Sequence, residues 1–329
     1  MSEPYVRIHA LMLVRDEDDI LAQCLDHLLT WCDAIHVLDT GSTDATWEIV
    51  QDKARHDARV KPFEQRRLRF HHGLRGWMFD RIRHTLEPGD WLAKLDADEF
   101  FPQTPPAFLR ERVRPWEGRV DYLAYYFRLT DRDVTAWDAG VESLADRSRP
   151  IQERRRFYQV ARYTEQRFFR YRRTLKWPPH CSTPMYGGHV ARARIPMLHY
   201  PHRDPAQMIK RFRLRARQSA HQPKNESFHW SVEDWRKEVV SVDHPLVDRV
   251  SEVHGLGELR QWRDGEALPE LDLTNHLDPW PRRWAKAAMY ATAMRLLDAR
   301  VPAFPDDYEP EPEPAPPAAA PDRAEPSIP

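Results

Sequence analysis

The sequence is short of the features that mark several large classes of protein. It contains no stretch of about 18 apolar residues, so we expect no membrane-spanning helix. A basic excess is also missing, because 50 Lys and Arg residues face 51 Asp and Glu residues and leave a formal net charge of -1. Nucleic-acid binding proteins usually carry a clear basic excess. We therefore expect no nucleic-acid partner.

Cysteine is scarce, and we expect no secretion signal. Cys24, Cys32 and Cys181 lack the spacing of metal ligands, and the first two fall in an apolar helical pattern, so we expect reduced core thiols. The N-terminus has a short apolar run with acids close behind it, which indicates a buried strand rather than a signal peptide. We expect a cytoplasmic protein that makes at most peripheral contact with the inner face of a membrane.

What is present is enough apolar sequence for a sizeable core. Hydrophobic residues make up 41% of the 329 residues, which suits one large α/β domain with a smaller appendage. Residues 302–329 are an exception, because this Pro-, Ala- and Glu-rich run cannot bury enough apolar surface to fold. We predict a disordered tail there.

Strands and helices alternate in the N-terminal part of the chain. The apolar patterns predict strands at 5–14, 34–39, 59–63 and 91–96, and helices around 20–29, 47–54 and 75–86. Such alternation predicts a mostly parallel sheet with right-handed crossovers and with helices on both faces. Ligands bind sheets of this kind at the carboxyl ends of the strands.

Two acidic motifs follow predicted strands and so belong at that edge of the sheet. In LDADEF, residues 95–100, Asp96 and Asp98 stand two positions apart where a strand becomes a loop, so both carboxylates can face one hard cation. Oxygen ligands favour Mg²⁺ or Mn²⁺, and such an ion would offset the charge on a departing nucleotide diphosphate. An isolated match of this kind is common, and a solvated acidic loop also explains it.

The second motif, VLDTGSTDAT at residues 37–46, is more specific. Asp39 ends a strand, Gly41 permits a sharp turn, and Thr43 or Asp44 caps the next helix. A carboxylate held there can accept a hydrogen bond from a nucleobase N–H or a ribose hydroxyl. A capped turn without any ligand explains the pattern equally well.

Together these motifs resemble the family 2 glycosyltransferases of GT-A fold, in their bacterial subset. The likeness covers about residues 5–101, from LMLVRDEDDILAQCLDHLLTWCDAIHVLDTGSTDATWEIV to WLAKLDADEF. The family pattern runs strand, Asn-Glu, helix, strand, Asp-x-Gly-Ser-x-Asp and then Asp-x-Asp. One departure is Asp16, which stands where the family usually has Asn and adds an acid near the nucleotide.

Position by position, the resemblance implies a donor site. Asp39 would contact the base of a nucleotide-sugar, Glu17 would lie beside the nucleoside, and Asp44 would support the turn. Asp96 would face the ribose or a metal ion, and Asp98 would bind the metal ion directly. We expect Asp98→Asn to abolish transfer and leave the fold intact, because a carboxylate in an exposed loop contributes little stability.

The second half of the chain resembles the family less closely. MLHYPHRDP, residues 197–205, looks like a His-Tyr-Pro segment of the bacterial subset and makes His199 a candidate third metal ligand. The basic helix that follows would bring Arg203, Lys210 or Arg211 near the phosphates. A structural histidine explains this segment as well.

Further elements are predicted beyond the motifs. An aromatic-rich strand is expected at 120–129, and a basic helix capped by Asp204 at 204–220. Another helix is predicted at 281–299. It packs on the core or, through residues 282–284, touches a membrane surface.

Inversion at the anomeric carbon needs a carboxylate that deprotonates the acceptor hydroxyl. Acids stand beside aromatics in TDRDVTAWDAGVE and in YTEQRFFR, and an aromatic ring is a usual platform for an acceptor sugar. We favour Glu165 over Asp138 and Glu142 as this base. An ion pair between Glu165 and Arg167 is the structural alternative.

Three other functions fit parts of the sequence. DTGS, residues 39–42, also occurs in aspartic proteases, but these need all-β surroundings and a second such loop. A nucleotidyltransferase would share the sheet and the metal-binding acids but would need a Gly- and Lys-rich phosphate loop, where this chain has RDEDD. A catalytically inactive GT-A-like protein that binds a partner through its Arg-rich surface would not need the acids at 39, 96 and 98.

We therefore predict a metal-dependent, inverting glycosyltransferase. It would move a sugar from a nucleotide-sugar to a hydroxyl acceptor on a glycan, a lipid-linked sugar or a protein, as in the synthesis of cell-surface polysaccharide. Residues 1–200 would form the GT-A domain, with a nucleotide-sugar-binding half at 1–101 and an acceptor half at 102–200. Residues 201–301 would form a helical extension packed on this domain.

Overall fold

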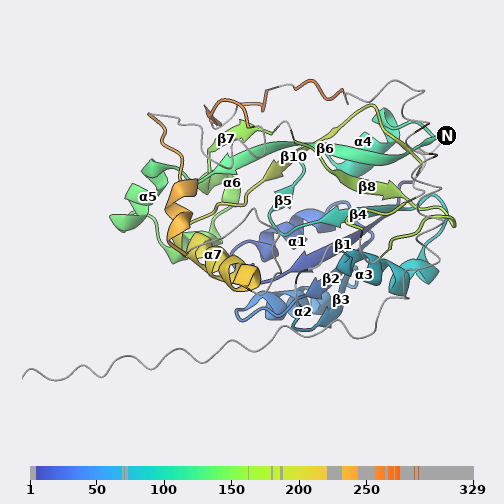
Figure 1. Ribbon diagram of the computed structural model, residues 1–329, viewed down its shortest axis with the longest axis horizontal. Helices are drawn as coiled ribbons and strands as arrows, with labels where there is room; N and C mark the ends of the chain where they lie inside the picture. Colours follow the sequence, from blue (N-terminus) through green and yellow to red (C-terminus); the bar gives the residue numbers. More distant parts are fainter. Residues whose placement is uncertain are drawn as a thin grey trace, which may run out of the picture.

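The chain forms one sheet with helices on both sides (Figure 1). The computed structural model describes residues 5–68, 70, 73–161, 163–178, 181–185, 188–220, 232–243, 256–263, 266–269, 271–274, 285 and 288. Within these residues 11 strands join into the sheet. The predicted α/β class is confirmed.

The N-terminal half follows the apolar patterns of the sequence. Its strands are β1 (Ile8–Val14), β2 (Ala34–Asp39), β3 (Val60–Gln65) and β4 (Trp91–Leu95), and its helices are α1 (Leu21–Leu29), α2 (Thr46–His56), α3 (Leu74–Ile82) and η1 (Arg83–Thr85). β1 lies between β2 and β4, β3 lies outside β2, and all of these pairings are parallel. All four predicted strands and the three predicted helices are present, with ends shifted by a few residues.

Side-chain alternation along β1 explains why helices cover both faces of the sheet. Met12 belongs to a core that includes Leu28 of α1, whereas its neighbour Leu11 belongs to a second core that includes Trp77 of α3. Every residue of β1 is buried, as expected of a central parallel strand.

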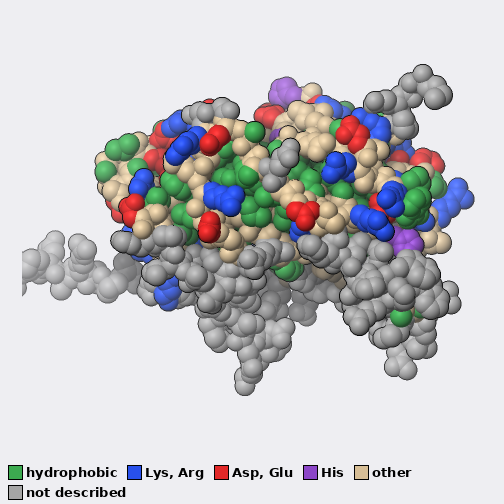
Figure 2. All heavy atoms as spheres, turned by 90° about the horizontal axis from the view of Figure 1, so that it is seen from above, with side chains coloured by type: hydrophobic (Ala, Val, Ile, Leu, Met, Phe, Trp, Pro, Cys, Tyr) green, Lys and Arg blue, Asp and Glu red, His purple; other side chains and the backbone are tan. Residues whose placement is uncertain are grey.

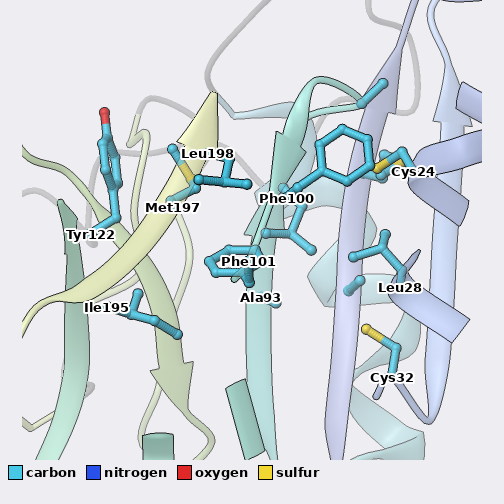
Figure 3. Packing of buried hydrophobic residues seen from close by; sticks show 14 of the residues in the cluster. Cys24, Leu28, Cys32, Ala93, Phe100, Phe101, Tyr122, Ile195, Met197 and Leu198 are labelled. Atoms are coloured by element: carbon cyan, nitrogen blue, oxygen red, sulfur yellow. The ribbon is translucent and has the colours of Figure 1, made fainter. Parts of the chain in front are cut away.

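Two of the three thiols lie in the first of these cores. Figure 3 shows Cys24 and Cys32 among apolar side chains, with Cys24 close to Phe100. Both thiols are free and buried as predicted, and burial raises their pKa well above the usual value.

The second half extends the sheet with strands of mixed direction. β8 (Gln166–Arg170) runs antiparallel to both β4 and the long β6 (Glu117–Arg128), which contains most of the strand predicted at 120–129. β10 (Ile195–His199) runs parallel to β6 and antiparallel to the short β5 (Glu99–Phe100). The remaining elements are α4 (Pro105–Arg112), α5 (Asp131–Asp138), η2 (Leu144–Ser148), α6 (Ile151–Arg154), β7 (Phe157–Val160), β9 (His189–Val190), α7 (Pro205–Ala220), η3 (Val232–Glu238) and β11 (Arg260–Gln261).

Helix α7 is the predicted basic helix at 204–220. Asp204 caps it, because its Oδ1 accepts the N–H of Gln207 at 2.8 Å. Met208 and Phe212 of α7 pack in a small core with Leu129, at the end of β6.

Two predicted segments fall largely outside the structure. The helix predicted at 281–299 lies outside the described residues apart from 285 and 288, and the tail at 302–329 lies wholly outside them. In the described part of the chain, every helix is too short or too polar to cross a membrane. On the face seen in Figure 2, acidic and basic side chains are interspersed, in keeping with the small net charge.

Candidate active site

The carboxyl ends of the parallel strands meet at one edge of the sheet. The register pairs Val14 with Asp39 and Met12 with Leu95, so the loops after β1, β2 and β4 leave the sheet side by side. β10 ends at the same place, because His199 pairs with Glu99, directly after the Asp-x-Asp loop. Figure 1 shows α7 beside the arrowhead of β1.

Asp39 is locked into its own turn. Its side chain is buried, with 0% exposure, and Oδ1 accepts the N–H groups of Gly41 at 2.8 Å and Ser42 at 2.7 Å. Gly41 has a φ of 105°, and a Cβ there would lie 3.0 Å from Arg67 Cα, so glycine is required. The predicted contact with a nucleobase would therefore have to use Oδ2, which lies 3.5 Å from the Gln65 amide nitrogen.

Asp16 and Asp44 join the neighbouring loops. Asp16 has a φ of 56°, a left-handed conformation that Asp and Asn adopt more readily than most residues, and its Oδ1 accepts the N–H of Thr43 at 2.7 Å. Asp44 accepts the N–H of Thr46 at 2.9 Å and so supports the start of α2, although Ala45 is the N-cap. Asp16, which stands where the family usually has Asn, thus binds the backbone of the loop after β2.

Asp98 lies among positively charged or protonatable side chains. His199 Nε2 is 3.5 Å from its Oδ1, and Arg211 Nη1 and Arg203 Nη1 are 3.4 and 3.7 Å from its Oδ2. Burial alone would raise the pKa of Asp98, but these neighbours hold that pKa well below its usual range. Asp98 is only 5% exposed, so the expectation of an exposed loop residue is wrong. The pairing of β5 with β10 places His199 against this loop.

Asp96 points towards different partners. Arg75 donates to its Oδ1, and Arg167 Nη2 lies 3.7 Å from its Oδ2. Burial opposes ionisation, but these guanidinium groups lower the pKa of Asp96. In the described part of the chain, no three His, Cys, Asp or Glu side chains are arranged to hold a metal ion. Asp98 and His199 lie side by side, whereas the carboxylate of Asp96 pairs with Arg75 and Arg167 instead.

The basic residues expected near the phosphates divide into two kinds. Lys210 pairs with Asp44 and lies 3.5 Å from Asp18 Oδ1, and both Lys210 and Arg211 are partly exposed. Arg203 is fully buried, with 0% exposure, so it cannot reach a phosphate. Of the three alternatives, Arg203 is thus the one that the structure does not favour, because its guanidinium is buried against Glu17 and Asp19.

Acids outnumber bases in the two ion-pair networks at this edge of the sheet. The side chains joined by these ion pairs are five acids and three bases: Glu17, Asp18, Asp19, Asp44, Asp98, Arg203, Lys210 and Arg211. Their formal charges leave an excess of two negative charges with Glu17 ionised, and of one with Glu17 protonated. Burial, with Asp98 and Asp19 nearby, raises the pKa of Glu17 to about 7. Asp98 and His199 offer a carboxylate and an imidazole side by side, a donor pair that fits Mn²⁺ or Mg²⁺ if a diphosphate and water complete the shell.

Glu165 is held in an ion-pair network. Lys94 Nζ and Arg167 Nη1 lie 3.0 and 2.7 Å from its Oε2, and the Tyr163 hydroxyl donates to Oε1 at 2.8 Å. Burial alone would raise the pKa of Glu165, but these groups lower that pKa to about 2. The ion pair with Arg167, which is the structural alternative for Glu165, is therefore present, and the role of Glu165 as the base stays a prediction.

The other two candidate bases lie away from Asp98. Glu142 forms a bidentate pair with Arg155, at 2.7 and 3.0 Å, and Asp138 is exposed at the last residue of α5. In Figure 1, α5 lies beyond α7 as seen from β4. Neither acid is among the described partners of Asp98 or His199.

A cavity of about 1230 Å³ lies against the face of β10 that carries Leu198. Its lining includes Phe101, Phe108, Tyr125 and Leu198. Because neighbouring side chains of a strand point to opposite faces, Leu198 faces this cavity and His199 faces Asp98. None of the predicted site residues lines the cavity, so it is separate from the candidate site.

Two residues of the site went unnoticed in the sequence. Arg75 is buried in α3, where it also donates to the carbonyl groups of Leu95 at 2.9 Å and Leu11 at 3.3 Å. Asp19 is buried against Arg203. Arg75 could have been identified in the sequence as a charged residue within the apolar face of a helix.

Comparisons with known proteins relate the chain to sugar-transferring enzymes. Residues 10–194, more than half of the chain, match the model of the family described as glycosyl transferase family 2. A search of curated proteins found no match.

Two solved structures show a distant likeness. The mannosyltransferase PcManGT from Pyrobaculum calidifontis, solved with GDP-Man and Mn²⁺, is 14% identical, and the match has a TM-score of 0.39 over 67% of this chain and 66% of that chain. Glucosyl-3-phosphoglycerate synthase from Mycobacterium tuberculosis, solved with Mn²⁺, UDP and phosphoglyceric acid, is 16% identical, with a TM-score of 0.24 over 40% and 46%. The match thus spans just under two thirds of the first chain and under half of the second.

Proposed function

We propose that this chain, which belongs to glycosyl transferase family 2, transfers a sugar from a nucleotide-sugar to a hydroxyl group of an acceptor. The observation that supports the proposal is the meeting of Asp98, His199 and the bases of α7 at the carboxyl edge of the parallel strands. Ligands of such sheets bind at that edge. A nucleotide diphosphate is an anion that suits both a metal ion and basic side chains.

The residues of this edge would divide the work of donor binding. Asp98 and His199 would hold Mn²⁺ or Mg²⁺, which when bound offsets the charge on the departing diphosphate. Lys210 and Arg211 now neutralise Asp44 and Asp98. In the donor complex they would turn to phosphate oxygens, because the metal ion would then compensate the acids.

The donor nucleoside would lie over the loops after β1 and β2. Glu17 is partly exposed at this position, and its backbone N–H donates to Thr46 Oγ1 at 2.8 Å. Asp39 would act mainly by shaping the turn through Gly41 and Ser42.

We further propose that transfer inverts the anomeric carbon. Inversion needs a carboxylate on the side opposite the departing nucleotide. Of the three candidates, Glu165 is joined to the Asp-x-Asp loop, because its partner Arg167 also lies 3.7 Å from Asp96, whereas Asp138 and Glu142 lie away from Asp98. The acceptor would be a glycan, a lipid-linked sugar or a protein.

A nucleotide panel tests this proposal. UDP, GDP, dTDP and CDP would each be added with and without Mn²⁺, and unfolding followed by thermal shift. A ligand of the folded state at about 100 times its Kd stabilises by roughly 2.7 kcal/mol, so one nucleotide should raise the Tm, and should do so more strongly with Mn²⁺. The corresponding monophosphate serves as control. No response to any nucleotide would contradict the proposal and favour a catalytically inactive binding protein.

A further inference from the structure

Arg203 is a fully buried guanidinium that faces three carboxylates from two loops. Its Nε and Nη2 lie 2.6 and 2.9 Å from the two oxygens of Asp19, as a bidentate pair. Nη2 also donates to Glu17, and Nη1 lies 3.7 Å from Asp98 Oδ2. Each nitrogen of the guanidinium therefore faces an acid.

The rest of Arg203 is fixed as firmly as its guanidinium. Nη1 donates to the carbonyl of Tyr200 at 3.3 Å, and the backbone N–H donates to Gln207 Oε1 at 3.2 Å. Its own carbonyl accepts from Arg155. Arg203 thus joins the loop after β1, the Asp-x-Asp loop and the start of α7 to one another.

We propose that Arg203 is a positioning residue for donor binding, an inference that rests on the proposed function. It holds Asp98 beside His199 and holds Glu17 beside the nucleoside loops, so it sets the spacing of the negative charges that a metal ion and a diphosphate meet. Because its exposure is 0%, it acts through these acids and does not touch the donor.

A lysine at position 203 could not bind Asp19 and Asp98 in the same way. The guanidinium is a planar fork that binds the two oxygens of Asp19 and still presents a third nitrogen to Asp98, whereas an ammonium is a compact point charge. Without the third nitrogen, Arg211, already 3.4 Å from Asp98 Oδ2, would compete more strongly for that oxygen. Asp98 would then be a weaker partner for the metal ion.

Arg203→Lys tests the proposal when compared with a matched control. Arg147→Lys is the control, because Arg147 forms a similar bidentate pair with the adjacent Asp204, at 3.0 and 2.9 Å. Titration calorimetry would measure the affinity of the active nucleoside diphosphate with and without Mn²⁺, and electron paramagnetic resonance would measure bound Mn²⁺. Residues that orient metal ligands typically change metal affinity by about 10- to 100-fold, so a loss of about this size is expected in Arg203→Lys. The control should match the wild type.

Because Arg203→Lys can prevent folding, Asp19→Asn is a second test. It removes the partner that orients the guanidinium and leaves Arg203, Glu17 and Asp98 in place. A weaker Mn²⁺-dependent affinity is expected here too. If the folded variants bind Mn²⁺ and nucleotide as the wild type does, even at a lower Tm, the role of Arg203 is merely structural and the proposal is overturned. If the wild type itself binds no nucleotide, the proposed function fails, and this inference fails with it.

Discussion

Asp98 combines burial with a full negative charge. Removing that charge in Asp98→Asn would leave Arg203 and Arg211 without their shared acid, and breaking a buried pair costs about 3 kcal/mol. We therefore expect both a lower free energy of unfolding, measured with urea, and loss of the Mn²⁺-dependent rise in Tm with nucleotide.

The control for this variant is Asp26→Asn. Asp26 is exposed and pairs with Lys53 at the surface, where such a pair contributes roughly 0–1 kcal/mol. Its removal should change neither property appreciably. An Asp98→Asn protein that keeps the wild-type response to Mn²⁺ and nucleotide would show that the metal ion is held elsewhere.

His27 has to stay neutral in the folded protein. Its Nε2 accepts the N–H of Phe101 at 3.0 Å, and burial lowers its pKa to about 4. An unfolded histidine titrates near pH ~6.5, so between these values the unfolded chain binds a proton that the folded chain does not. This contribution to stability is complete above the unfolded pKa and is lost as the pH falls towards 4.

We therefore expect acid to destabilise the protein before its carboxylates are protonated. The free energy of unfolding should fall by on the order of 1–2 kcal/mol from His27 alone between about pH 7 and pH 5. His27→Gln keeps an acceptor oxygen and should flatten the slope in part, since burial also lowers the pKa of His36 to about 4. An unchanged slope in the variant would contradict the neutral state of His27.

At the scale of elements, the sequence predicts strands and helices better than side-chain contacts. β2 spans 34–39 as predicted, because a short apolar run between turn residues is a local signal. The pairing of Glu99 with His199 joins residues that are distant in the sequence, and no local pattern reports it. That pairing places His199 beside Asp98, so the surroundings of Asp98 depend on a long-range contact.

In helix α7, too, the sequence pattern does not report long-range contacts, and this helix leads to a further prediction. Its basic residues could be read from the sequence, but not that Lys210 would pair with Asp44 across the site. If Lys210 serves the diphosphate, Lys210→Ala should weaken nucleotide affinity by about tenfold, equivalent to roughly 1.4 kcal/mol. Arg213→Ala, an exposed position on the same helix, should have no effect. Titration calorimetry on both variants decides, and equal affinities would remove Lys210 from the donor site.

At the scale of the whole molecule, the parallel half of the sheet was predictable and its extension was less so. The aromatic-rich pattern predicts β6, but the place of β6 beside β8 and β10 depends on long-range pairing. The domain boundary predicted at residue 200 also falls within the candidate site, because His199 precedes it and Arg203 follows it. Chemistry at this edge therefore needs the start of the C-terminal extension.

The proposed donor site depends on one location for the metal ion. Crystals grown with Mn²⁺ and the nucleoside diphosphate selected by the panel would show the ion by anomalous scattering. We predict a peak within coordination distance of Asp98 and His199, with the diphosphate turned towards Lys210 and Arg211. A peak away from both Asp98 and His199, or a diphosphate bound at another edge of the sheet, would contradict it.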